Sequence, residues 1–485
     1  MIEMKKVSFK YENSGDGGAV KDINVTVQNG QVVLVCGESG SGKTTFGRMI
    51  NGLIPSYYEG EVSGEVLVNG HNVFECELHE IAPVIGSVFQ NPKSQFYTLL
   101  VDTEVVFACE NLGLDREEIL KRFDEAVKLY GLENIVGKSL FELSGGEKQK
   151  VACASVGALD PDVYVLDEPT SNLDIGTIRE LKNIIYDLKK RGKTIIIIEH
   201  RLSWLRDVVD RVLYFEDGII KIDEAADKFF GKSAGELHGY GLRTDYDFNP
   251  KTREIKDNGK LVLDYCKYKI KKHEILDITD VQIPKGSVVA VLGNNGMGKS
   301  TFARAMCGLI KKSKSLIMDN DEKLKDKVRQ KKCYMVMQDV NHQLFSESVL
   351  DDIMIGQDEN DEAKKKRAEE IIKWLDLEGL EELHPMSLSG GQRQRVAIAG
   401  AVMSEKDYII FDEPTSGLDY RHMREVSKVI GELSQMGKTQ FVITHDPELV
   451  EECCNYYIFM EKGKVVRQGS WEEGDVEFIR SYFSE

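Results

Sequence analysis

An internal repeat constrains the fold of this chain more than any other feature of its sequence. Four segments of the first half return in the same order in the second half. They are GESGSGKTT (37–45) and GNNGMGKST (293–301), FELSGGEKQKVA (141–152) and MSLSGGQRQRVA (386–397), VLDEPTSNLD (165–174) and IFDEPTSGLD (410–419), and the histidines His200 and His445. A repeat of this length predicts two copies of one folded unit rather than a single large core.

The spacing between the two copies is partly fixed and partly variable. Ser144 and Ser389 are 245 residues apart (389 − 144), and the same interval separates the DEPTS segments and the two histidines. The glycine-rich segments are 256 residues apart (293 − 37). Because packed elements tolerate changes of length less well than surface loops, the constant block should be tightly packed. We predict a first domain at 1–242, a polar linker at 243–258 and a second domain at 259–485.

Composition narrows the functional classes. A net charge of −18 over 485 residues argues against a nucleic-acid-binding protein, and we interpret the basic runs at 311–314 and 364–367 as solvated segments. The apolar runs are too short to cross a bilayer, and the first residues lack the apolar core of a signal peptide. The nine cysteines match no metal-site spacing, so we expect reduced, buried thiols in a cytosolic chain.

Short apolar runs alternate with helical patterns in each copy. Residues 31–37 and 287–293 are predicted strands that lead into the glycine-rich segments and then into helices. Residues 163–168 and 194–200 are predicted as two further buried strands, separated by a helix from Thr177 to Lys190. This alternation predicts an α/β fold with a largely parallel sheet in each copy.

The glycine-rich segments both match the phosphate-binding pattern G-x-x-x-x-G-K-[ST]. Their glycines let backbone N–H groups surround phosphate oxygens at the positive end of the following helix. We expect Lys43 and Lys299 to reach the β- and γ-phosphates of ATP, and Thr44 and Ser300 to bind Mg²⁺. The predicted nucleotide-binding residues of the two loops are Gly37, Gly40, Gly42, Lys43, Thr44, Thr45, Gly293, Gly296, Gly298, Lys299, Ser300 and Thr301.

Two predicted strands end in adjacent carboxylates. Asp167 and Asp412 are expected to hold Mg²⁺, and Glu168 and Glu413 to polarise the water that attacks the γ-phosphate. A single Asp-Glu pair at the end of a strand is as easily a solvent-facing acidic pair. Its recurrence, about 120 residues after each phosphate loop, favours the catalytic interpretation.

The segments LSGGE and LSGGQ begin predicted helices. A serine hydroxyl, glycine N–H groups and a helix N-terminus together form a second anion site, and the residues concerned are Ser144, Gly145, Gly146, Ser389, Gly390 and Gly391. For one copy, an N-capped helix after a glycine turn would explain the pattern as well. Both segments resemble the signature of ABC-type ATPases, and the resemblance extends over nearly the whole chain.

This resemblance implies further features. Each domain would add an antiparallel β subdomain and a helical subdomain to its sheet. Tyr11 and Tyr268 would stack on adenine, although Tyr265 competes with Tyr268. His200 and His445 would contact the γ-phosphate. The family pairs its domains head to tail, here within one chain, which makes homodimerisation unnecessary, with Asp174 and Asp419 in the loops that cross between them.

The implied pair has two composite sites. One would combine Lys43, Thr44, Gln90, Asp167, Glu168 and His200 with Ser389 and Gly391, and the other would combine Lys299, Ser300, Gln338, Asp412, Glu413 and His445 with Ser144 and Gly146. Both halves retain the lysine, glutamate, serine and histidine. We therefore predict two sites that hydrolyse ATP.

The segments after Gln90 and Gln338 resemble those of energy-coupling factor importers. Each glutamine is followed five residues later by another, Gln95 and Gln343. The first glutamine would coordinate Mg²⁺ or the attacking water, and the residues after it would move a docking surface. The resemblance implies a polytopic membrane scaffold and a membrane substrate-binding component as partners, at the cytoplasmic side of the cell membrane.

Alternatives to this subtype are another class of ABC transporter, such as a sugar-type tandem importer or an exporter, and a ribosome-associated translation factor. The transported substrate, whether a vitamin, a vitamin precursor or a transition metal, stays open. Only 40 residues follow His445, which leaves little room for a C-terminal helical extension.

Overall fold

The computed structural model describes residues 1–12, 20–171, 173–243, 248–250, 255, 258–358 and 360–484. The chain divides into two compact units, Met1–Asp245 and Tyr246–Glu485. Each unit contains a six-stranded sheet, a four-stranded sheet and a set of helices, which confirms the predicted α/β fold with one sheet core in each copy. Much of the predicted linker lies outside the described residues, but Phe248 within it is buried in the core of the second unit.

The six-stranded sheet of the first unit has the order β10-β9-β3-β8-β7-β6. Its strands are β3 (Val32–Gly37), β6 (Ile85–Val88), β7 (Val163–Asp167), β8 (Thr194–Ile198), β9 (Arg211–Glu216) and β10 (Ile219–Ala225). Neighbours pair in parallel except β9 with β10. Both faces of β3 and β8 are buried, which explains their uninterrupted apolar sequences.

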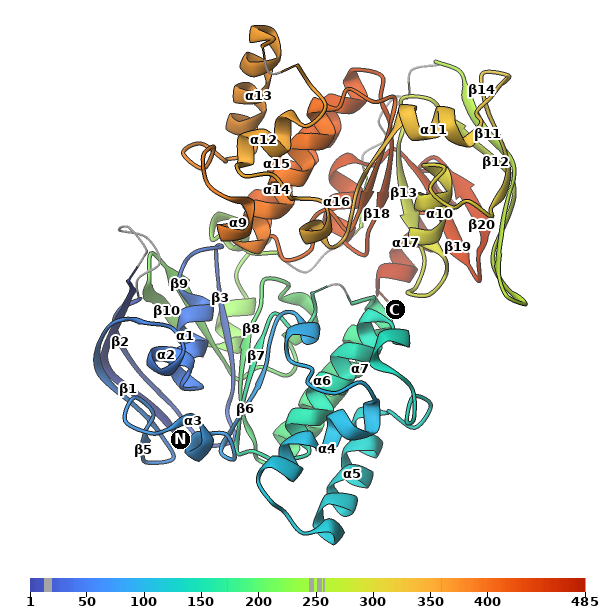
Figure 1. Cartoon of the computed structure of the whole chain (residues 1–485). Coiled ribbons are helices and arrows are strands. Elements are labelled where there is room, and N and C mark those ends of the chain that lie inside the picture. Colours follow the sequence, from blue (N-terminus) through green and yellow to red (C-terminus); the bar gives the residue numbers. More distant parts are fainter. Residues whose placement is uncertain are drawn as a thin grey trace. The chain divides into compact units, whose positions relative to one another are not determined.

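The second sheet of the first unit is antiparallel, in the order β2-β1-β4-β5. Its strands are β1 (Ile2–Tyr11), β2 (Val20–Val27), β4 (Gly60–Val68) and β5 (His71–Asn72). The helices of this unit are α1 (Lys43–Ile50), α2 (Leu53–Ser56), α3 (Leu78–Ile81), α4 (Val101–Asn111), α5 (Arg116–Tyr130), α6 (Gly145–Gly157), α7 (Ile175–Lys190), α8 (Ala226–Phe230) and α9 (Ala234–Gly239). Figure 1 shows α4 and α5 beside α6, on the opposite side of the central sheet from β1 and β2.

The second unit has the same two sheets. The six-stranded sheet, β16-β17-β18-β13-β19-β20, contains β13 (Val288–Leu292), β16 (Cys333–Val336), β17 (Tyr408–Asp412), β18 (Thr439–Ile443), β19 (Tyr456–Glu461) and β20 (Lys464–Gly469). The antiparallel sheet, β12-β11-β14-β15, contains β11 (Lys260–Ile270), β12 (His273–Pro284), β14 (Lys314–Asp319) and β15 (Glu322–Lys323). The helices are α10 (Lys299–Met306), α11 (Asp326–Lys332), α12 (Val349–Met354), α13 (Glu362–Trp374), α14 (Gly390–Met403), α15 (Tyr420–Gln435), α16 (Pro447–Cys453) and α17 (Glu473–Ser484). In Figure 1, α12 and α13 lie beside α14, away from β11 and β12.

The end of the chain differs from the expectation. The residues after His445 form α16, the β19–β20 hairpin and α17, a helix of 12 residues that the sequence did not predict. Phe478 and Tyr482 of α17 pack against Phe459 of β19, and Arg480 donates two hydrogen bonds to the carbonyl oxygen of Phe248. The C-terminal helix therefore packs on its own half of the chain.

Two further expectations concern the cysteines and membrane-spanning helices. All nine cysteines are free thiols, and all but Cys76 are buried, as expected for cysteines used as small apolar side chains. Within the described ranges, no helix combines the length and the apolar character needed to cross a membrane.

Candidate nucleotide-hydrolysis sites

The first phosphate loop joins the end of β3 to the start of α1. Gly37 has a φ of 147°, and a Cβ atom there would lie 2.2 Å from the carbonyl oxygen of Phe215, so no other residue fits. Lys43 Nζ donates hydrogen bonds to the carbonyl oxygens of Gly37 (2.9 Å) and Glu38 (2.6 Å). The buried lysine therefore lies inside the turn of the loop, at the N-terminus of α1.

The second phosphate loop repeats this arrangement between β13 and α10. Gly293 has a φ of 131°, and its added Cβ would lie 2.2 Å from the carbonyl oxygen of Met460. Lys299 Nζ donates to the carbonyl oxygens of Gly293 (2.6 Å) and Asn294 (2.9 Å). Its Nζ also lies 3.2 Å from Nε2 of His445, so this lysine joins the loop to the end of β18.

The carboxylates of the first half have pKa values shifted in opposite directions. Burial, and next the charge of Glu168, raise the pKa of Asp167 to about 7. Burial also acts to raise the pKa of Glu168, but the hydrogen bond and charge of His200, the charge of Lys43 and the hydrogen bond from Ser171 together lower this pKa. The hydroxyl of Thr44 lies 3.4 Å from Asp167. A buried carboxylate beside a hydroxyl suits a hard cation such as Mg²⁺, which would favour the charged form of Asp167.

Glu168 is the centre of the first site. Its carboxylate accepts a hydrogen bond from Gln90 Nε2 at 2.6 Å, lies 3.2 Å from Nε2 of His200 and accepts a longer bond from Ser171 at 3.4 Å. The residue has a positive φ of 44°, an unfavourable conformation for a side chain with a Cβ. Gln90 and His200, two residues that the sequence predicted separately, therefore converge on the carboxylate of Glu168.

The second site has a different centre. Glu413 also has a positive φ, of 51°, but its Oε1 lies 3.7 Å from Nε2 of His445. That nitrogen is nearer to Lys299 Nζ and to Asn295 Oδ1, both at 3.2 Å. Burial raises the pKa of Asp412, and a hydrogen bond from Ser300 opposes this shift. The backbone N–H of His445 also donates to Glu413 Oε2 at 3.3 Å, so the histidine contacts both the glutamate and the phosphate-loop lysine here.

An acidic residue beside each histidine was not predicted. Glu199 precedes His200 and accepts a hydrogen bond from Thr170 at 2.5 Å, while Asp446 follows His445 and accepts from Thr415 at 2.6 Å. Both threonines belong to the DEPTS segments. The sequence signal was the contrast between EH and HD, which places the acid on opposite sides of the histidine in the two copies.

The signature serines are helix N-caps. Ser144 accepts from the backbone N–H of Glu147, and the carboxylate of Glu147 accepts from the N–H of Ser144, which is a capping box at the start of α6. Ser389 and Gln392 form the same box at the start of α14. Each serine is thereby held at a helix N-terminus, the position that the anion-site prediction requires.

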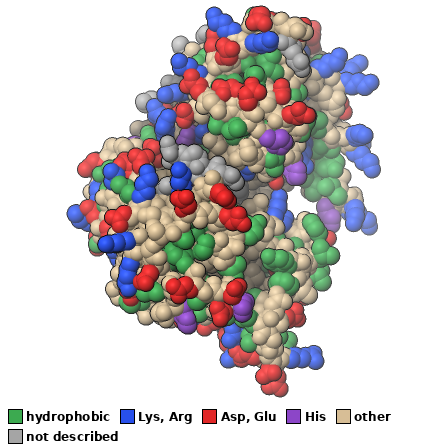
Figure 2. Space-filling view, turned by 60° about the vertical axis from the view of Figure 1, so that its left-hand side comes forward, with side chains coloured by type: hydrophobic (Ala, Val, Ile, Leu, Met, Phe, Trp, Pro, Cys, Tyr) green, Lys and Arg blue, Asp and Glu red, His purple; other side chains and the backbone are tan. Residues whose placement is uncertain are grey.

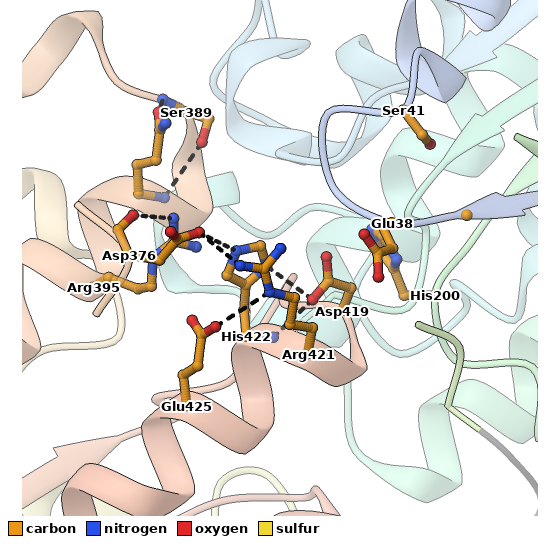
Figure 3. A network of polar contacts seen from close by, with 12 residues as sticks. Glu38, Ser41, His200, Asp376, Ser389, Arg395, Asp419, Arg421, His422 and Glu425 are labelled. Atoms are coloured by element: carbon orange, nitrogen blue, oxygen red, sulfur yellow. Dashed lines mark hydrogen bonds and ion pairs between the residues drawn. The ribbon is translucent and has the colours of Figure 1, made fainter. Parts of the chain in front are cut away.

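The loops that end the DEPTS segments also cap helices. Asp174 accepts from the N–H of Thr177 in α7, and Asp419 accepts from the N–H and from Nδ1 of His422 in α15. Figure 3 shows how His422 lies within a larger network in the second half. Arg421 pairs with Asp376 and Glu425 in this network, and Arg395 donates to the carbonyl oxygen of Asp376. Since Arg421 already pairs with both carboxylates, this cluster is an ion-pair network around the cap.

The predicted adenine-stacking tyrosines have unequal surroundings. The hydroxyl of Tyr11 lies 3.1 Å from that of Thr45 in α1 and accepts from Arg48 at 3.0 Å. Both Tyr265 and Tyr268 belong to β11, where Tyr268 packs against the core and Tyr265 is exposed. Tyr268 is therefore the more buried of the two tyrosines. The stacking of Tyr11 and Tyr268 on adenine stays a prediction.

The second glutamine of each pair has a structural role. Gln95 accepts from the N–H of Phe89 at 3.2 Å and donates to the carbonyl oxygen of Ser87 at 3.0 Å. Gln343 accepts from the N–H of Met337 at 3.1 Å and donates to the hydroxyl of Tyr334. Both side chains therefore tie the segment after the first glutamine back to the preceding strand.

Together, a parallel sheet, two glycine loops with buried lysines and two strand-end carboxylate pairs define a tandem nucleotide-hydrolysing protein. Residues 20–171 and 276–416 match the family model of the ABC transporter, and the chain belongs to this family. It is therefore an ATP-binding protein with ATPase activity.

Full-length relatives agree with this assignment. The chain is 40% identical to a protein of Treponema denticola that is provisionally named an ABC transporter ATP-binding protein, over 96% of this chain and 97% of the relative. A Saccharolobus solfataricus protein with the same description is 31% identical over 99% of this chain and 96% of the relative. Among solved structures, a chain from a model of ribosome-bound archaeal Pelota and ABCE1 superposes with a TM-score of 0.70 at 21% identity, covering 98% of this chain and 80% of that chain. The last similarity concerns the fold alone.

Proposed function

We propose that this protein is the ATPase of a membrane importer of the energy-coupling factor type, which takes up a vitamin, a vitamin precursor or a transition metal. Its partners in this proposal are a polytopic membrane scaffold and a membrane substrate-binding component, and it acts at the cytoplasmic side of the membrane. The observation that supports the proposal best is a set of exposed apolar side chains in each half. Tyr97 and Phe345 follow the glutamines Gln90 and Gln338, and Phe141 and Met386 precede the signature segments.

In the first half, the backbone of the segment after Gln90 is held by hydrogen bonds, and apolar side chains of this segment are exposed. The carboxylate of the buried Glu104 accepts from the N–H groups of Tyr97 and Thr98. The ring of Tyr97 nevertheless stays 77% exposed and stacks on Phe107 of α4. Phe141, two residues before the signature Leu143, is 80% exposed. A buried acid that holds exposed aromatic rings in place is expected at a docking surface.

The second half repeats this arrangement with other side chains. Asp352 accepts from the N–H groups of Phe345 and Ser346, in the place of Glu104. Phe345 is 76% exposed, and Ile355 and Met386 are also exposed. Because the apolar character recurs while the residues change, the two surfaces would contact similar but not identical partner segments.

Direct contact between Gln90 and Glu168 supports coupling between this surface and the site. A change at the carboxylate can move Gln90 across their 2.6 Å hydrogen bond, and Gln90 begins the segment that contains Tyr97. We further propose that Mg²⁺ is held by Thr44, Gln90 and Asp167 in the first half and by Ser300, Gln338 and Asp412 in the second.

Surface charge agrees with a protein partner better than with nucleic acid. The chain has a net charge of −18. On the face shown in Figure 2, Asp and Glu side chains are interspersed with Lys and Arg, and hydrophobic side chains reach the surface between them. A nucleic-acid-binding surface would instead gather its basic side chains into one area.

The proposal is tested by isolating the protein from native membranes with its bound partners. The expected result is a complex that contains a polytopic scaffold and a small substrate-binding membrane protein. Replacing Tyr97 and Phe141 together by Ala should release the first-half contact, and Phe345→Ala with Met386→Ala should release the second. Leu120→Ala in α5 is the matched control, since Leu120 is another exposed apolar side chain outside both segments.

The alternatives predict other outcomes. Co-sedimentation with ribosomes instead of membranes would contradict an importer and favour a translation factor. A scaffold of another transporter class in the isolated complex would leave the docking role intact and contradict the energy-coupling factor subtype alone.

A further inference from the structure

The two histidines at the ends of β8 and β18 differ at their Nδ1 atoms. In the first half, Nδ1 of His200 is buried and has no hydrogen-bond partner among the residues that the structure describes. In the second half, Nδ1 of His445 lies 3.2 Å from the hydroxyl of Tyr482. Tyr482 belongs to α17, which follows the last of the recurring segments.

The two ring nitrogens of His445 have different neighbours. At Nε2, the ammonium group of Lys299 can only donate and Oδ1 of Asn295 can only accept, both at 3.2 Å, so these two contacts favour opposite tautomers. When Nε2 accepts from Lys299, the ring proton of the neutral histidine is on Nδ1, which donates to the hydroxyl oxygen of Tyr482. Tyr482 therefore fixes the orientation of the ring.

A hydroxyl group can also serve the opposite tautomer. When Nε2 holds the proton and donates toward the site, Nδ1 becomes an acceptor, and the hydroxyl of Tyr482 rotates to donate to it. A phenylalanine at this position would fill the same space and satisfy neither tautomer. Because His445 is buried, the lost hydrogen bond would leave its Nδ1 without a replacement from bulk water.

Other contacts hold α17 in place independently of this hydrogen bond. The ring of Tyr482 lies edge-on to Phe459, with centroids 5.1 Å apart. Near the start of the helix, the hydroxyl of Tyr457 donates to Asp475 at 2.5 Å. The Tyr482 hydroxyl is therefore presented to His445 by a helix that is anchored at both ends.

We propose that Tyr482 is a positioning residue for His445, so that ATP hydrolysis at the second site depends on the docked C-terminal helix while hydrolysis at the first site does not. The inference rests on the proposed contact of His445 with the γ-phosphate. Tyr482 itself contacts the histidine, and acts on the reaction through it.

The test uses Tyr482→Phe in the full-length chain, which keeps the ring against Phe459 and removes the hydroxyl. In a chain that also contains Glu168→Gln, so that only the second site turns over, kcat should fall about five- to tenfold with KM for ATP changed less than about twofold. If Glu168→Gln silences the whole chain, the sites are coupled and the same loss should appear in its absence. Chemical shifts of the His445 ring nitrogens should also change, because Nδ1 loses the hydrogen bond to the Tyr482 hydroxyl.

Tyr457→Phe is the matched control, because it removes another tyrosine hydroxyl that holds α17 but does not reach His445. It should leave kcat within about twofold and the His445 spectrum unchanged. A Tyr482→Phe variant with normal turnover, or one whose loss is matched by Tyr457→Phe, would overturn the proposal. His445→Ala distinguishes the role of His445 from the role of Tyr482. Normal turnover of this variant would refute the proposed role of His445. A large loss of turnover in His445→Ala, together with normal turnover in Tyr482→Phe, would refute only the role of Tyr482.

Discussion

The two hydrolysis sites contain the same recurring motifs but connect them through different atoms. In the first site, Gln90, His200 and Ser171 converge on the carboxylate of Glu168. In the second site, Lys299, Asn295 and Tyr482 converge on the ring of His445. Recurring motifs therefore do not guarantee equal hydrogen bonding. Asn295 stands in the second phosphate loop where the first has Ser39, and Tyr482 comes from α17, outside the recurring segments.

The largest effect is expected from removing the charge of the two glutamates. Glu168→Gln and Glu413→Gln should each lower ATP turnover at their own site by about 10²- to 10³-fold, because an amide cannot polarise the attacking water as a carboxylate does. Phosphate release measures this loss, with the double variant as the baseline. If Glu168→Gln left turnover unchanged while Glu413→Gln abolished it, only the second site would hydrolyse ATP.

The phosphate loops should respond alike, which makes them a control for the comparison. Gly37→Ala and Gly293→Ala each place a Cβ 2.2 Å from a backbone carbonyl oxygen at a positive φ, so each should destabilise its unit by about 2–4 kcal/mol. Chemical denaturation measures the change. Gly40→Ala and Gly296→Ala should cost less, since an added Cβ there meets nothing within 4 Å. Unequal losses at Gly37 and Gly293 would show that the loops themselves differ.

A smaller effect is expected from the glutamine that contacts Glu168. Gln90→Ala should lower partner-stimulated turnover about tenfold while the affinity for ATP changes little, because the 2.6 Å bond links the site to the exposed segment. Stimulated and basal rates with nucleotide titrations make the measurement, and Gln338→Ala is the matched variant. Weakened ATP binding without loss of stimulation would reduce Gln90 to a part of the pocket.

The smallest effect concerns stability and pH. Asp319 lies opposite Leu261 in the second half, where the first half has Val68 opposite Ile2. Burial acts to raise the pKa of Asp319, but the hydrogen bond from Lys285 at 2.6 Å, the nearby hydroxyl of Tyr408 and the charges of Lys285 and Lys332 together lower the pKa.

A lowered pKa means that the stabilisation is present above the unfolded pKa of about 4 and is lost as the pH falls through the folded value. Lys285→Met should therefore destabilise the second unit by at most about 1 kcal/mol at neutral pH and by less near pH 3. Denaturation at both pH values tests this. A difference that did not shrink in acid would mean that Lys285 contributes through packing instead.

Much of the fold was predictable because the same pattern of strands, helices and motifs occurs in both halves of the sequence. Buried strands such as β3 and β8 are continuous apolar runs. The helix predicted from Thr177 to Lys190 differs from α7 only at its start, because α7 begins two residues earlier, at Ile175, with Asp174 as its N-cap. The glycine positions of the loops were predictable for the same reason, since positive φ values and close backbone contacts exclude other residues.

The hydrogen bonds within the two sites were not predictable, because they depend on contacts between residues far apart in the sequence. No spacing in the chain relates His445 to Tyr482, which comes from a helix that follows all the recurring segments. Thr170 and Thr415 lie within recognised motifs, but their acidic partners occupy different positions relative to the histidines. The positive φ values of Glu168 and Glu413 also leave no trace in residue type.

The contacts of Phe248 with α17 have a consequence for local unfolding of the second half. Arg480 bonds to the carbonyl oxygen of Phe248, and Phe483 packs on its ring. The first and last segments of this half should therefore exchange their amide hydrogens together, as one cooperative element, although more than 200 residues separate them. Fraying of α17 would then release Phe248 and the ring of His445 in a single event.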